Sequence, residues 1–341
     1  MSNLKMVNIG DLPRTTELAE RFMYPFSQLN FLLNGGIFGR VVMVAAPTDN
    51  GKSTAVSQIL DYIIEQDYKV GAFFGEDSLL EARDRIYKQA TSYSSDNIYY
   101  KTYEQNGKKT NTGEYIISEE AFEIAQKKFD GKFFLFPVDF GAEVDKILGA
   151  FDDLIKEHGV KVFVLDNADQ FEFASDNENK AMRDIQIKIR NFAISRNVLI
   201  FLVAHTRKLE RNVILPDLND IKGTSALVNI ARDVMILIRT DKIDRTTKEY
   251  SNLVKLLKLN NYDIEEKDKD GNYKVDAILR VAKTKGRKLG FVCLGFNRIS
   301  QTYYEVKKID EAKAESDRSN VVVENVQLLE IPEQDMLDLP F

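Results

Sequence analysis

A short polar segment near the N-terminus has the residue types that bind a nucleoside triphosphate. It comprises Ala46, Pro47, Thr48, Asp49, Asn50, Gly51, Lys52, Ser53 and Thr54. In loops of this kind the backbone N–H groups surround the phosphates, the lysine reaches the β- and γ-phosphates, and the serine hydroxyl binds Mg²⁺. The sequence therefore predicts that residues 46–54 bind ATP or another nucleoside triphosphate, with Lys52 on the phosphates and Ser53 on the metal.

The neighbouring residues support this prediction. An apolar run at residues 41–45 precedes the segment and is typical of a buried strand, and apolar residues recur at helical spacing after it. A Gly-Lys-Ser triplet alone also fits an ordinary surface loop, but a strand before it and a helix after it are what a phosphate-binding loop requires. Ala46 occupies a position where glycine is usual.

Three further polar residues end apolar runs and have side chains suited to nucleotide hydrolysis. Asp166 is a candidate for holding Mg²⁺, Glu76 for activating the attacking water, and His205 for sensing the γ-phosphate. Each has a plainer alternative. Asp166 suits a helix N-cap, Glu76 suits the start of a helix, and His205 suits the end of a strand without any role in catalysis.

Apolar runs alternate with helical patterns along most of the chain. The runs lie at residues 41–45, 70–74, 133–136, 162–165, 198–203 and 234–238. Strands that alternate with helices predict βαβ units and an α/β fold, in which helices cover both faces of a mostly parallel sheet. Continuous apolar strands fit such a doubly covered sheet.

The C-terminal half and the insertions depart from this alternation. Residues 254–259, 277–282 and 291–296 are predicted to form antiparallel hairpins. Residues 92–118 are polar and rich in tyrosine, and we interpret them as an insertion that contains a hairpin.

We divide the chain into three parts. Residues 1–26 form a lead or linker, with a short helix expected at residues 15–22; residues 27–308 form the nucleotide-binding domain; and residues 309–341 form an acidic C-terminal tail. Such a tail is expected to be mobile.

Composition limits the function classes. The chain has 341 residues, a formal net charge of −6 and a single cysteine, Cys293, so an internal disulfide is excluded and a reducing, cytoplasmic compartment is expected. No apolar stretch approaches the ~20 residues that span a bilayer, so no membrane partner is expected. An acidic chain carries no global field that attracts nucleic acid, and any such binding must come from a local basic patch or a channel between subunits.

The motifs together resemble the ATPase domain of the DnaB-family hexameric helicases, which has a RecA-like fold, and are most similar to the phage primase-helicase and mitochondrial Twinkle group. Alanine is common at the first loop position of that family, as in Ala46, and Glu76 with Arg85 matches its Glu-x8-Arg pattern. Further matching segments lie at residues 164–171, 204–208, 220–234 and 282–290.

The resemblance implies an ATP-dependent replicative DNA helicase that forms a ring, with 5′–3′ movement on single-stranded DNA, in a viral or phage replisome. It implies DNA contacts in the loop at residues 206–223, from Lys208, Arg211, Lys222 and Gly223. It also implies a cation that reaches a neighbouring subunit's nucleotide. Lysine stands where the family has arginine, so both Lys285 and Arg287 remain candidates for this cation.

The acidic tail and two other protein classes leave alternatives open. Residues 335–341 resemble the acidic tips that contact replisome proteins such as a polymerase, primase or clamp, but they also fit an ordinary acidic tail. The phosphate-loop constellation also fits a RecA- or RadA-like recombination ATPase, or a KaiC-like regulatory ATPase. ATP and Mg²⁺ are expected in all three classes.

Overall fold

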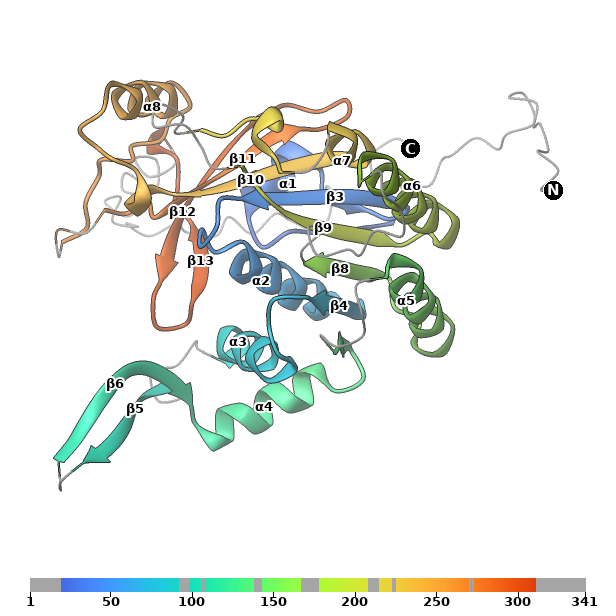
Figure 1. Cartoon of the computed structure of the whole chain (residues 1–341). Coiled ribbons are helices and arrows are strands. Elements are labelled where there is room, and N and C mark those ends of the chain that lie inside the picture. Colours follow the sequence, from blue (N-terminus) through green and yellow to red (C-terminus); the bar gives the residue numbers. More distant parts are fainter. Residues whose placement is uncertain are drawn as a thin grey trace, which may run out of the picture.

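The computed structural model describes residues 20–91, 98–105, 108–137, 143–166, 178–207, 215–222, 225–269, 271 and 273–310. Its centre is a nine-stranded sheet in the order β13-β12-β11-β10-β3-β9-β8-β4-β7 (Figure 1). Its strands are β3 (Arg40–Ala46), β4 (Val70–Phe74), β7 (Phe133–Phe136), β8 (Val162–Asp166), β9 (Leu199–His205), β10 (Asp233–Arg239), β11 (Ala277–Lys283), β12 (Gly290–Asn297) and β13 (Thr302–Glu305).

Six of these strands run parallel and three run antiparallel. Strands β10, β3, β9, β8, β4 and β7 form the parallel part, and β11, β12 and β13 continue the sheet as an antiparallel meander beside β10. The predicted α/β fold with C-terminal antiparallel strands is therefore confirmed.

Helices cover both faces of the sheet. They are α1 (Ser27–Leu33), α2 (Lys52–Glu65), α3 (Leu79–Thr91), α4 (Glu119–Phe129), α5 (Val144–His158), α6 (Glu178–Arg196), α7 (Ser225–Ile230) and α8 (Lys248–Leu259). Helices α1 to α4 pack on one face, in a core with residues such as Val42 and Val44. Helices α5 to α7 pack on the other face, against Val41 and Met43. Because successive side chains of a strand point to opposite faces, each apolar strand supplies both cores.

The element at residues 254–259 is a helix, so the predicted hairpin strand there is wrong. Tyr250, Leu253, Val254 and Leu257 are buried in a third core cluster beside β11 and β12. Their spacing of three and four residues is helical. The Thr247 side chain also caps the helix by accepting a hydrogen bond from the Tyr250 N–H. The periodicity of the whole segment 248–259 therefore outweighs the short apolar run inside it.

The N-terminal lead packs into the domain. Arg21–Phe22 forms the short strand β1, which pairs with β2 (Gly36–Ile37), so the helix expected through residue 22 is wrong at these residues. Phe22, Tyr24 and Phe26 are buried, which shows that the packed core begins before residue 27. Residues 1–19 lie outside the described part of the chain.

Residues 92–118 contain the hairpin that the sequence predicts. Strands β5 (Ile98–Gln105) and β6 (Lys108–Ile117) pair antiparallel and project away from the sheet beside α3 and α4 (Figure 1). Helix α4, which follows the hairpin, had no counterpart in the sequence-based prediction. Among the described residues, no helix combines the length and the apolar character needed to cross a membrane.

Candidate nucleotide-binding site

The predicted site residues come together because the strands that carry them are parallel and in register. Ala46 at the end of β3 pairs with His205 at the end of β9, and Phe74 at the end of β4 pairs with Asp166 at the end of β8. Carboxyl ends of parallel strands meet at one edge of the sheet, which is where ligands bind in open α/β folds. Lys52, Ser53, Glu76, Asp166 and His205 are therefore neighbours although they span much of the sequence.

The loop between β3 and α2 has the backbone that phosphate binding needs. Gly51 is the N-cap of α2 and has φ 77°, and Asp49 has φ 58°. Residues that carry a side chain rarely adopt such positive φ angles. A Cβ at Gly51 would also lie 2.4 Å from the Tyr303 hydroxyl. The first N–H groups of α2 have no partner within the helix and point towards this loop, which favours a bound anion.

Ser53 and Asp166 fit a magnesium site. The Ser53 hydroxyl donates a 2.6 Å hydrogen bond to Asp166 Oδ2. Asp166 is buried, and no described residue bonds its other carboxylate oxygen, Oδ1. Burial raises the pKa of the Asp166 carboxyl, and the hydrogen bond from Ser53 and the charge of Lys52 act against this. A hydroxyl and one carboxylate are the oxygen ligands that suit Mg²⁺ when phosphates and waters supply the rest.

Glu76 lies at the centre of the polar cluster. Its carboxylate is 3.7 Å from Lys52 Nζ and 3.1 Å from His205 Nε2. The Lys52 side chain is almost fully buried, whereas the Glu76 side chain is 46% exposed. Glu76 thus faces the open side of the site, next to the lysine expected to bind the β- and γ-phosphates. A carboxylate in that position can accept a proton from an attacking water.

Arg85 supports the turn that carries Glu76. Its Nε donates to the Ser57 hydroxyl at 3.2 Å, its Nη1 pairs with Asp77, and its guanidinium lies 4.9 Å from the centre of the Phe74 ring. Through these contacts Arg85 ties α3 to α2 and to the residue that follows Glu76. The Glu-x8-Arg spacing therefore joins a residue in the site to an arginine that holds its turn.

Contacts around Asn50 also hold the loop, and sequence reasoning missed their partners. The Asn50 side chain donates to the Thr48 carbonyl at 3.0 Å and accepts from the Arg239 N–H at 2.9 Å. Lys242 Nζ donates to the Asp49 carbonyl at 2.6 Å. The end of β10 thus fixes the phosphate loop from the side. Only the parallel pairing of β10 with β3 brings these residues together, and no sequence motif indicates it.

His205 is connected through the backbone to the loop that the sequence predicts to contact DNA. The Lys222 N–H donates to the His205 carbonyl at 2.7 Å, and the Arg207 N–H donates to the Asp220 carbonyl at 2.6 Å. The Lys222 side chain is exposed. The predicted DNA contacts Lys208, Arg211 and Gly223 lie outside the described residues.

Lys285 and Arg287 lie at the opposite end of the sheet from the phosphate loop. Lys283 at the end of β11 pairs with Val234, close to where β10 and β3 both begin. At about 3.3 Å per residue, Ala46 is about 13 Å from Val42 along β3. Lys285 and Arg287 are exposed beyond the far end. Neither lies near the phosphate loop of its own chain.

We predict that Asp166→Asn stabilises the protein when metal and nucleotide are absent. The amide keeps an acceptor for the Ser53 hydroxyl but removes a desolvated carboxylate, whose burial costs free energy. Thermal unfolding in buffer with EDTA should show a higher Tm than wild type, and magnesium-dependent ATP hydrolysis should be lost. A Tm well below that of wild type would show that the charge stabilises the fold.

The comparisons with known proteins agree with this geometry. A family model described as an AAA domain matches residues 11–211. No curated protein matches the chain. Among solved structures, a DnaB-like replicative helicase, in a study of its interactions with primase, has a TM-score of 0.64 and 17% identity. That match covers 83% of this chain and 63% of the helicase chain. This chain therefore spans less than two thirds of the length of that helicase.

Two further structures show how widely the fold is shared. A solved ATPase domain has a TM-score of 0.63 and 16% identity, with 83% of this chain and 90% of that chain covered. A KaiC-like protein from the archaeon Pyrococcus horikoshii has a TM-score of 0.54 and 14% identity, with 85% and 100% covered. At these identities the likeness establishes the fold. The match over residues 11–211 establishes the family, and the chain is therefore a member of an AAA domain family of nucleotide-binding ATPases, with the RecA-like fold of the DnaB-like helicases.

Proposed function

We propose that the chain is an ATP-dependent DNA helicase that moves along single-stranded DNA as a ring of identical subunits. The observation that carries the proposal is the short path from the site to the predicted DNA loop. Glu76 lies 3.1 Å from the His205 side chain, and the His205 carbonyl accepts from Lys222. A change at the γ-phosphate that moves His205 would therefore also move Lys222.

The residues of the site have distinct roles in this proposal. Lys52 binds the β- and γ-phosphates, and the N–H groups at the start of α2 surround them. Ser53 and Asp166 hold Mg²⁺, which neutralises phosphate charge when bound. Glu76 accepts the proton of the attacking water, and Lys285 or Arg287 of an adjacent subunit stabilises the charge that develops on the transferred phosphoryl group.

The ring explains how an acidic chain could hold DNA. The net charge of −6 gives no general attraction to phosphates. If the loops at residues 206–223 of several subunits line one channel, their cations are concentrated along one strand. Such binding would be independent of sequence and strongly dependent on salt. A replisome protein that contacts residues 335–341 remains part of the same proposal.

We predict that the purified chain hydrolyses ATP faster with single-stranded DNA and unwinds a forked duplex, and that Glu76→Gln abolishes both. Loss of a general base should lower kcat about 10²–10⁴-fold, while ATP binding persists because Lys52 and Ser53 are intact. Asp84→Asn is the control, since Asp84 is an exposed carboxylate on α3 paired with Arg83.

Other outcomes of this assay assign the chain to another class. ATPase activity that ignores DNA would favour a KaiC-like regulatory role, and strand exchange or filament formation would favour a recombination ATPase. Turnover at the wild-type rate in the glutamine variant would refute the role of Glu76 in all three classes.

We predict that Lys222→Ala weakens single-stranded DNA binding and makes it less dependent on salt. Loss of one phosphate contact should lower the slope of log affinity against log salt concentration by about 0.7 for each subunit that contacts the strand. Fluorescence anisotropy of a labelled oligonucleotide at several salt concentrations measures this slope. Lys248→Ala on α8 removes an exposed lysine elsewhere and should change nothing; an unchanged slope for Lys222→Ala would exclude it as a phosphate contact.

We predict that the cation acts between subunits and that mixing variants reveals it. Glu76→Gln alone and the double variant Lys285→Ala/Arg287→Ala alone should both be inactive. Mixed and reassembled in equal amounts, they should recover activity, because roughly a quarter of random interfaces join an intact Glu76 to intact cations. The single variants Lys285→Ala and Arg287→Ala then identify the cation. Absence of any recovery would contradict action between subunits.

A further inference from the structure

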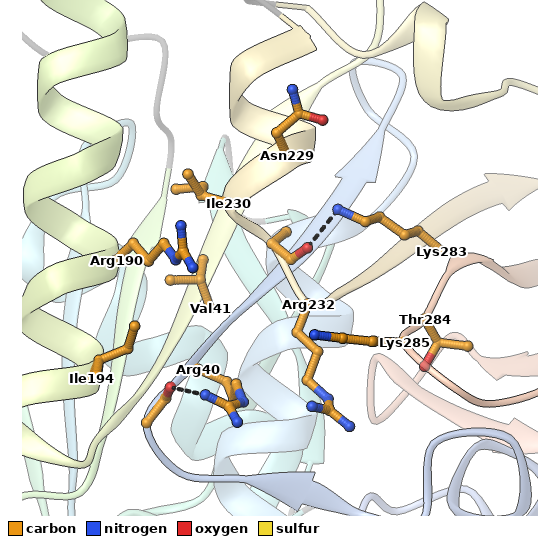
Figure 2. Close-up of a pocket in the computed structure, with 12 residues that line it drawn as sticks. Arg40, Val41, Arg190, Ile194, Asn229, Ile230, Arg232, Lys283, Thr284 and Lys285 are labelled. Carbon is orange, nitrogen blue, oxygen red and sulfur yellow. Dashed lines mark hydrogen bonds between the residues drawn. The ribbon is translucent and has the colours of Figure 1, made fainter. Parts of the chain in front are cut away.

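A basic pocket lies at the end of the sheet remote from the nucleotide-binding site. Its volume is about 400 Å³, and Arg40, Arg190, Arg232, Lys283 and Lys285 line it together with Val41, Ile194 and Ile230. Figure 2 shows these residues around the opening, with Arg190 and Ile194 coming from α6. No acidic residue is part of the lining. Five cations around one cavity repel one another, and a bound anion would relieve that repulsion.

The cations of the pocket differ in whether the protein already supplies them with a hydrogen-bond acceptor or a carboxylate. Lys283 Nζ donates to the carbonyls of Val228 and Ala231, at 2.6 and 2.8 Å. Arg232 lies 3.8 Å from the Asp233 carboxylate, which in turn accepts from Thr284. By contrast, no carboxylate of the described residues lies within ion-pair distance of Arg190 or Lys285. Exposed cations without a counter-ion, beside apolar side chains, suit a ligand that is both acidic and apolar.

This chain contains a segment with that character. Residues 319–341 include no lysine or arginine, and their acidic residues are Glu324, Glu330, Glu333, Asp335 and Asp338. Leucine, isoleucine, methionine and phenylalanine alternate with these acids, as in the sequence from Met336 to Phe341. The acids would meet the arginines, and the apolar side chains would meet Ile194, which is 49% exposed, and its apolar neighbours in the pocket.

The segment can also reach the pocket. The Val306 N–H donates to the Cys293 carbonyl, and Cys293 pairs with Ile278 near the start of β11. Lys283, at the pocket, is five residues further along the same strand, about 17 Å away. The last described residue, Asp310, is at most about 14 Å from Val306. Residues 311–323, if fully extended, span about 43 Å. The acids from Glu324 onwards are therefore within reach.

We propose that residues 324–341 bind in the basic pocket of their own chain. Because Lys285 belongs both to the pocket and to the proposed contact with a neighbour, the bound segment would cover the surface through which one subunit reaches the next. Competition between the bound segment and assembly of the ring rests on the proposed function. Binding of the segment to the pocket is independent of it.

Anisotropy of a labelled peptide of residues 324–341 tests the proposal without ATP or DNA. We expect it to bind the chain truncated after residue 318, with an affinity that falls as salt rises. Arg40→Glu/Arg190→Glu should weaken binding about ten-fold or more, since two ion pairs are reversed. Lys188→Glu, a charge reversal on α6 outside the pocket, should not. A peptide with Gln or Asn in place of its acids should not bind.

The full-length chain provides the second comparison. An attached segment has an effective concentration in the millimolar range, so the full-length chain should bind the added peptide far more weakly than the truncated one. Equal binding by both, or by the Arg40→Glu/Arg190→Glu variant, would overturn the proposal. An oligonucleotide or inorganic phosphate that binds the pocket where the peptide does not would also overturn it and would assign the pocket to phosphate groups. Helicase activity is measured separately, so either proposal can fail alone.

Discussion

The register of the parallel strands is the constraint on which the rest of the structure depends. The pairing of Ala46 with His205, and of Phe74 with Asp166, brings the ends of four strands to the same end of the sheet. A shift by one residue would move each apolar side chain into the opposite core, and the packing of the two cores opposes that shift. The same hydrophobic packing that stabilises the sheet therefore places the catalytic candidates.

Burial shapes the chemistry of the polar cluster. Asp166 lies in an almost dry position where its charge is costly, and Ser53 and Lys52 offset part of that cost. Lys52 is likewise buried but lies near the Glu76 carboxylate. Because an uncompensated buried charge destabilises a fold, a cation bound beside Asp166 would offset the remaining cost. Binding of a cation at Asp166 would therefore lower the free-energy cost of burying its carboxylate.

The sheet also separates two kinds of positive charge. At its carboxyl edge, Lys52 lies 3.7 Å from the Glu76 carboxylate. At the other end, Arg190 and Lys285 face a common pocket without a carboxylate among the described residues. A single chain cannot bring these two ends together, because the strands between them are rigid. Contact between them requires a second copy of the chain, and this geometry motivates the ring hypothesis.

The sequence by itself determined most of the local elements and indicated the candidate site residues. Continuous apolar runs predicted the parallel strands, and Gly51-Lys52-Ser53 predicted the phosphate loop, because these signals lie within a few neighbouring residues. The same local reasoning failed at residues 254–259, where a short apolar run lies inside a helix, and at Arg21–Phe22, which pairs as a strand with distant residues. Only the tertiary structure decided the strand order. The strand order brings Asn50 to Arg239 and His205 to Lys222, and it places Arg190 and Lys285 around one pocket. These contacts join residues that are far apart in the sequence, and they exist because hydrophobic packing of the whole sheet brings them together.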